Sequence, residues 1–192
     1  MGVDKVIFRA FISTLLAIVT LLAFMIGALC LAFPSTMMEL TYDLGMEKSS
    51  IHFAERAYKR SDDVYYIAYA TEVAIERESA DKIVEDGDKF IQDEDFSVYC
   101  DGKGGIYEQY IYGQVVLAKY EKGDKTSAVL TAFEAVKEGF PKNNAVVALI
   151  VKALRQNDQE TVLRIHGELL KIQESVPDTD SAYFNEILAL TE

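Results

Sequence analysis

Two histidines and two cysteines are the side chains best suited to metal binding or nucleophilic chemistry in this chain of 192 residues. His52 and His166 are far apart in the sequence, and a zinc site needs several converging ligands. Cys30 falls within an apolar run, and Cys100 is the single cysteine after it, so no disulfide forms within the rest of the chain. We therefore expect no metal site. Cys100 remains either a free thiol or a cysteine that pairs between chains.

Two stretches of the sequence partly match loops that bind phosphate or calcium, but each lacks a required residue. In Gly123-Asp124-Lys125-Thr126 an aspartate separates the glycine from the lysine, and the upstream glycine of a phosphate loop is missing. Asp178 and Asp180 begin like a calcium loop, but Tyr183 occupies the position that requires glycine. No serine or cysteine lies in a nucleophile-elbow pattern. We expect no cofactor, no catalytic residue and no enzymatic activity; an enzyme site assembled from scattered residues is the remote alternative.

Tyrosine is the residue type that the sequence concentrates. All eleven tyrosines follow residue 33, and two groups stand out: Tyr65, Tyr66 and Tyr69, and then Tyr99, Tyr107, Tyr110, Tyr112 and Tyr120. A tyrosine ring offers a large contact area and a hydrogen-bonding hydroxyl, which suits protein interfaces. The alternative is that several of these rings pack between helices.

The charge after residue 33 is strongly acidic, with thirty acids against seventeen bases. Binding to nucleic acid needs a basic face, so this function class is excluded. The same charge argues against a domain that lies flat on anionic lipid. Acids are densest over residues 72–101, where they form either a solvated face or a surface for a basic partner.

Residues 10–33 carry no charge and form the longest apolar run. As a helix these 24 residues span roughly 36 Å, enough to cross a hydrocarbon core of about 30 Å. Lys5 and Arg9 precede the run and Glu39 and Asp43 follow it, so residues 1–9 are expected in the cytoplasm and the rest outside a bacterial cell membrane. The alternatives are a cleaved signal peptide, whose apolar core is normally shorter, and a lipoprotein acylated at Cys30.

The remaining chain is predicted to consist of helices, because apolar residues recur at intervals of three and four. Turn residues at 61–63, 93–95, 141–144 and 177–178 separate them. Equivalent turn positions recur at intervals of 33, 45 and 34 residues, at Gly45, Glu78, Gly123 and Asn157. Gly and Asn tolerate the left-handed conformation at such turns. The long interval indicates an inserted loop from Glu94 to Gly104.

Second helices of the predicted hairpins share positions that are often small, which favours a close approach of the two helices of each hairpin. These positions are Ser50, Ala54 and Ala57; Ile83, Gly87 and Phe90; Ala128, Ala132 and Ala135; and Val162, His166 and Leu169.

This pattern resembles the tetratricopeptide repeat family, whose unit is a pair of antiparallel helices. The match is best over residues 109–142, where Tyr112, Gly123, Ala128 and Ala135 take the family's aromatic, turn and small positions and Pro141 lies one residue past the closing proline. The resemblance implies a solenoid of about 3.5–4 helical hairpins over residues 34–178. With the transmembrane helix expected from the apolar run and a capping helix within residues 179–192, the fold is predicted to be all-α.

In proteins of this family the first helices of the repeats line a groove that grips a peptide. Carried onto this chain, the groove positions are Tyr65, Glu72, Glu76, Tyr110, Leu117, Tyr120, Glu121, Asn144, Val151 and Arg155.

Two functions of different classes are expected from these features. The first is a membrane-anchored module, an adaptor or a chaperone-like protein, that binds a protein or peptide outside the cytoplasm. The second is a structural subunit of a membrane complex that assembles through residues 10–33.

Overall fold

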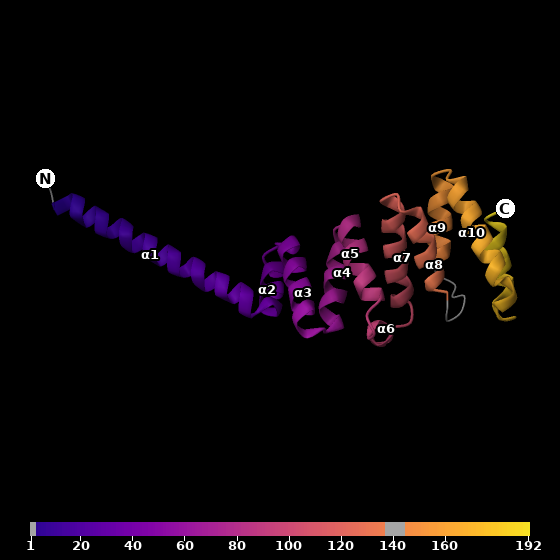
Figure 1. The fold of residues 1–192 in the computed structure, drawn as a ribbon, viewed down its shortest axis with the longest axis horizontal. Coiled ribbons are helices and arrows are strands. Elements are labelled where there is room, and N and C mark those ends of the chain that lie inside the picture. Colours follow the sequence, from indigo (N-terminus) through magenta and orange to yellow (C-terminus); the bar gives the residue numbers. More distant parts are fainter. Residues whose placement is uncertain (1–2, 137–144) are drawn as a thin grey trace. The chain divides into compact units, whose positions relative to one another are not determined.

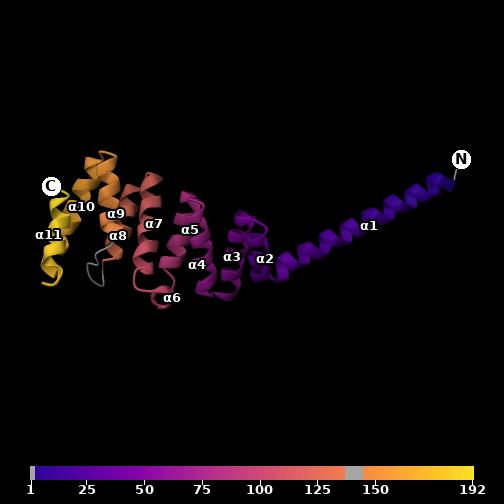
Figure 2. The same cartoon turned by 180° about the vertical axis from the view of Figure 1, so that it is seen from behind.

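A computed structural model describes residues 3–136 and 145–192, and all regular structure in these residues is helical. The chain divides into two compact units, Met1–Asp62 and Asp63–Glu192, which are described separately. The helices, shown in Figures 1 and 2, are α1 (Val3–Ala32), α2 (Pro34–Asp43), α3 (Glu47–Ser61), α4 (Val64–Glu76), α5 (Ala80–Ile91), α6 (Phe96–Lys103), α7 (Tyr107–Glu121), α8 (Lys125–Glu134), α9 (Ala145–Arg155), α10 (Gln159–Ile172), η1 (Gln173–Ser175) and α11 (Ser181–Ala189).

In the first unit, α1 is long and apolar enough to cross a membrane. Within its segment Phe8–Ala32, the most apolar stretch has a mean hydropathy of 2.7, and the rest of the protein does not bury that stretch at all. The helix extends beyond the predicted segment at its N-terminus, because Val3–Ala32 is helical throughout. These observations confirm a single N-terminal apolar helix.

The break between α1 and α2 falls at Phe33. Its backbone leaves the helical region at φ −131° and ψ 63°, because a residue before proline is disfavoured in the α region. Pro34 then occupies the first turn of α2, where its missing N–H costs no hydrogen bond. At the end of α3, Arg60 donates a hydrogen bond of 2.8 Å to the carbonyl of Ala32. The hairpin therefore returns to the point where α1 ends.

All four predicted turn positions adopt the left-handed conformation. The φ values are 69° for Gly45, 54° for Glu78, 84° for Gly123 and 53° for Asn157. In each turn the following residue donates to a carbonyl five positions back, for example Asp124 to Lys119 at 3.0 Å. This pattern is the Schellman motif, which satisfies carbonyls at the end of a helix. Turns of one kind thus connect α2 to α3, α4 to α5, α7 to α8 and α9 to α10.

The prediction of a loop from Glu94 to Gly104 is wrong, because α6 occupies most of it. The helix continues through Gly102, and Phe96 and Cys100, four residues apart, are its buried residues. Gly104, at φ 104°, ends it. The glycines after Asp101 were given too much weight as helix breakers, and an apolar face that packs against its neighbours outweighs their low helix propensity.

The second unit consists of consecutive hairpins that pack on one another. Helix α7 contacts α5 of the preceding hairpin and α9 of the following one, and α8 contacts both α9 and α10. The equivalent positions of the second helices are buried, except His166, which is half-buried. At Gly87 the tightest neighbour is Val115 of α7, which would overlap any Cβ atom, while Thr71 in the same hairpin lies 3.7 Å from that position. The close approach is therefore to the next hairpin rather than within its own.

The C-terminal helix α11 lies within the residues 179–192 in which a capping helix was predicted. Phe184 and Ile187 are its buried residues, whereas Leu190, just after the helix, is 48% exposed. Thr191 and His166 add a hydrogen bond of 2.8 Å that links the C-terminus to α10.

Candidate functional site

The predicted groove residues lie on the first helices of three hairpins in the second unit. Tyr65, Glu72 and Glu76 are on α4, and Val151 and Arg155 are on α9. Helix α7 carries Tyr110, Leu117, Tyr120 and Glu121. Asn144 lies outside the described residues. The resemblance thus selects positions on α4, α7 and α9.

Most of these side chains are accessible to a partner. Tyr65 is 45% exposed, Tyr110 is 46% exposed, and Val151 is 37% exposed. Glu76, Glu121 and Arg155 are also exposed, and Glu72 and Leu117 are half-buried. Two rings, two aliphatic side chains and several charges are therefore available on the first helices.

Tyr120 is the exception, because it is only 3% exposed. Its hydroxyl donates to Asp158 at 2.8 Å, across from α7 to the start of α10. Burial, followed by this hydrogen bond, raises the pKa of Tyr120 to about 12. Tyr120 is a packing residue between hairpins, and the groove prediction is corrected on this point.

Asp158 joins the third hairpin to the fourth. Besides the bond from Tyr120, its carboxylate accepts a hydrogen bond of 2.7 Å from the Thr161 hydroxyl. It also forms an ion pair with the Lys125 ammonium at 2.8 Å. Burial alone would raise the pKa of Asp158, but the hydrogen bonds from Lys125, Thr161 and Tyr120 outweigh it and hold the pKa well below its usual range. The carboxylate also caps α10 through the Thr161 N–H.

Lys119 links α7 to α5 and to α8. Its ammonium lies 2.6 Å from Asp88 of α5 and donates to the Thr131 hydroxyl of α8 at 2.9 Å. The side chain is only 8% exposed, so these contacts compensate for its desolvation. Lys119 and Asp158 together hold α7, the helix with most of the predicted groove residues.

Glu72 belongs to an aromatic cluster that α6 helps to build. The Tyr107 hydroxyl donates to the Glu72 carboxylate, and the Lys103 ammonium lies 3.6 Å from it. Lys103 also lies over the rings of Tyr99 and Tyr107, at 5.5 Å and 5.8 Å from their centres. Desolvation and the Glu72 contact raise the pKa of Tyr107. This arrangement was missed from the sequence, because it depends on the unpredicted α6.

An open cleft of about 300 Å³ lies between the α4–α5 turn and α7. It contains two of the predicted groove residues, Leu117 and Glu121; none of the others lines it. Its lining consists of Ile75, Glu78, Ala80, Ile83, Gln114, Leu117, Ala118 and Glu121. Aliphatic walls with two carboxylates at their edge suit a long aliphatic side chain that ends in a cation.

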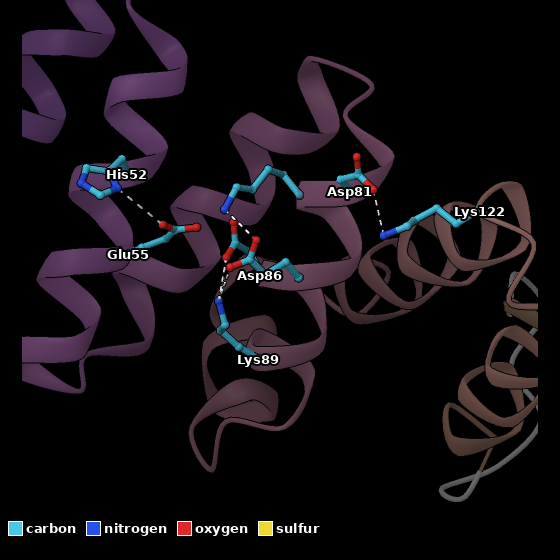
Figure 3. A network of polar contacts seen from close by, with 8 residues as sticks. His52, Glu55, Asp81, Asp86, Lys89 and Lys122 are labelled. Carbon is cyan, nitrogen blue, oxygen red and sulfur yellow. Dashed lines mark hydrogen bonds and ion pairs between the residues drawn. The ribbon is translucent and has the colours of Figure 1, made fainter.

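Ion pairs surround this cleft. Lys122, next to Glu121, lies 2.8 Å from Asp81 at the start of α5, as Figure 3 shows. Lys152 of α9 lies 2.5 Å from Glu121. Farther along α5, Lys89 lies 3.1 Å from the buried Asp86 (Figure 3). An exposed pair such as that of Lys152 and Glu121 contributes little to stability, so Glu121 can exchange Lys152 for a cation of a partner at small cost.

The histidines and cysteines lie at separate places. His52 is exposed and lies 3.9 Å from Glu55 on its own helix (Figure 3), whereas His166 contacts Thr191. Cys100 is 1% exposed, and burial, with smaller effects of Glu108 and Asp101, raises the pKa of its thiol to about 12. A buried thiol with this pKa is a poor nucleophile and a poor partner for a disulfide.

No protein-family model matches this chain, and no curated protein or solved structure matches it either.

Proposed function

We propose that this chain is a single-pass, membrane-anchored interaction module of the tetratricopeptide-like class. Helix α1 spans a bacterial cell membrane with residues 1–9 in the cytoplasm. The hairpins from α2 to α10 form a solenoid that α11 caps, and the acidic second unit stays outside the cytoplasm. There it binds a segment of a protein partner and does not act as a catalyst.

The cleft beside α7 is the observation that carries this proposal. Leu117 and Glu121, chosen from the resemblance alone, meet the α4–α5 turn around a volume of about 300 Å³. The exposed Tyr110 lies on the same helix, two turns before Leu117. Aliphatic and carboxylate groups next to an exposed ring favour a peptide that carries a lysine or arginine.

The anchor makes a shallow cleft useful. A tether confines both the module and a membrane-associated partner to one surface, which raises their effective concentration. Because affinity does not follow from area alone, a contact of modest size then suffices for capture.

Photo-crosslinking in native membranes tests this function. A photoreactive amino acid is placed at Leu117 or Tyr110, and, as matched controls, at Leu130 or Leu163, which are 60% and 65% exposed on the second helices α8 and α10. We expect one protein adduct common to Leu117 and Tyr110 and absent at the controls. Equal adducts at all four positions, or none at Leu117 and Tyr110, would contradict the proposed groove.

The exposed surface of α1 favours a second candidate, a structural subunit that assembles through this helix. Replacing residues 10–33 with an unrelated apolar helix separates the two functions. We expect the crosslinks at Leu117 and Tyr110 to survive the exchange. Their loss, with α1 still inserted, favours the structural subunit.

A further inference from the structure

An apolar stripe runs along α2 beside its buried face. Phe33, Met37, Leu40 and Leu44 follow one another at intervals of four, three and four residues, which places them on one side of a helix. Phe33 is 56% exposed, Leu40 is 48% exposed and Leu44 is 65% exposed. Met37 is half-buried between them. Three exposed large apolar side chains on one side of a helix indicate a surface that something covers.

The stripe begins where the apolar segment of α1 ends. No linker intervenes, because the Phe33 N–H donates to the Leu29 carbonyl at 2.9 Å and the Met37 N–H donates to the Phe33 carbonyl at 3.1 Å. If α1 spans a bilayer, the lipid around α1 is therefore adjacent to Phe33 and to the start of the stripe.

The break at Phe33 determines whether the rest of the stripe stays at the same depth as Phe33. Leu44 follows Phe33 by eleven residues, or roughly 16 Å of helix, whereas a headgroup layer is only about 5–8 Å thick. A helix that continued the axis of α1 would carry Leu44 into water. The non-helical conformation of Phe33 turns α2 away from that axis, as Figure 1 shows.

Charge at this point also fits phospholipid. Arg60 contacts the Ala32 carbonyl at the last residue of α1, so a membrane-spanning α1 would bring its guanidinium near the lipid phosphates. Only part of its five donors is used there, and exposed Lys59 adds a second cation. Residues 34–62 hold five acids and four bases, so an anionic surface repels this hairpin far less than it repels the second unit.

We propose that the α2 stripe lies in the headgroup region of the leaflet from which α1 emerges, so that the first hairpin docks on phospholipid. This inference rests on the proposed function, in which α1 spans the membrane. It concerns the first hairpin alone and agrees with an acidic second unit that stays off the lipid. Docking fixes the hairpin at the bilayer surface by the same burial of an apolar face that holds interfacial helices.

The chain contains no tryptophan, so a single introduced tryptophan reports its own position. Three full-length variants are placed in phosphatidylcholine–phosphatidylglycerol vesicles with or without bromine on the lipid acyl chains near the headgroups. Leu44→Trp tests the stripe, Phe24→Trp in α1 is the inserted control, and Val98→Trp on α6, a site 72% exposed, is the control in the second unit. We expect brominated lipid to quench the first two variants to a comparable extent and to leave Val98→Trp unchanged.

The outcomes separate this inference from the proposed function. If Phe24→Trp is quenched and Leu44→Trp is not, the anchor stands and the docking is overturned. A blue-shifted but unquenched Leu44→Trp emission means that a second copy or another protein covers the stripe, which also overturns it. If Phe24→Trp is not quenched, α1 is not in the bilayer, and both proposals fail.

Discussion

The two units of this chain differ most in where they place charge and apolar surface. The first unit, Met1–Asp62, holds six acids and six bases, whereas the second, Asp63–Glu192, holds twenty-five acids and thirteen bases and thus the whole net charge of −12. The first unit exposes the apolar surface of α1 and the α2 stripe, and the second buries most of its large apolar side chains. We propose on this ground that lipid covers the apolar surface of the first unit, while the second depends on its own packing and polar contacts in water.

The largest effect is expected from breaking the ion pair between the buried Lys119 and the half-buried Asp88. Asp88→Ala leaves the Lys119 ammonium in a buried site with only the Thr131 hydroxyl, which should cost about 3 kcal/mol. Urea unfolding of the full chain in detergent micelles measures the loss.

The double variant Asp88→Ala/Lys119→Met is the matched control for this prediction. It removes the stranded charge and should recover most of the stability. Hydrogen exchange in α2 and α3 should remain unchanged in both variants. A double variant as unstable as Asp88→Ala would contradict the role of Lys119.

Close packing between hairpins gives the second prediction. Gly87→Ala forces a Cβ atom against Val115, and we expect a loss of about 1–3 kcal/mol. Gly113→Ala on α7 adds the same methyl group where no neighbour lies within 4 Å, so the helix should gain about 0.5–1 kcal/mol. The same urea titration compares them. Equal effects of the two substitutions would show that the approach of α5 to α7 is not tight.

The smallest predicted effect is a pH dependence confined to the second unit. The pKa of Asp158 is lowered in the folded state, so its stabilisation is present above the unfolded value of about 3.9 and is lost as the pH falls toward the folded value. The free energy of unfolding should therefore decline below about pH 5. Asp158→Asn keeps a capping residue at α10 and should be less stable at neutral pH, with a shallower decline in acid. Unchanged acid sensitivity in this variant would remove Asp158 as its source.

Local patterns in the sequence predicted most helices and turns, but they did not predict how the helices contact one another. Three of the four left-handed turns are marked by Gly or Asn, which report a local backbone requirement, and the fourth, at Glu78, was found from its spacing of 33 residues after Gly45. Helix α6 was missed, although Phe96 and Cys100 at a spacing of four residues mark its buried face. The three glycines that follow Asp101 led to the prediction of a loop instead.

The candidate site depends on contacts between distant residues, which the sequence does not display. Tyr120 and Asp158 are 38 residues apart, and nothing local to Tyr120 distinguishes a buried ring from an exposed one. Leu117 and Glu121 were selected by position, whereas the cleft beside them also needs Glu78 and Ile83 from another hairpin. The sequence analysis did not identify the stripe on α2, because the spacing of its apolar residues alone does not show which of them the helix buries.

The central claim is that α1 anchors the chain and leaves the acidic second unit outside the cytoplasm. A membrane-impermeant maleimide tests this claim on intact spheroplasts, because Cys100 is buried and Cys30 lies in α1. Leu163→Cys places a thiol on the exposed face of α10. We expect Leu163→Cys to be labelled in intact spheroplasts and the unmodified chain to remain unlabelled. Labelling of Leu163→Cys only after lysis would place the second unit in the cytoplasm and contradict this account.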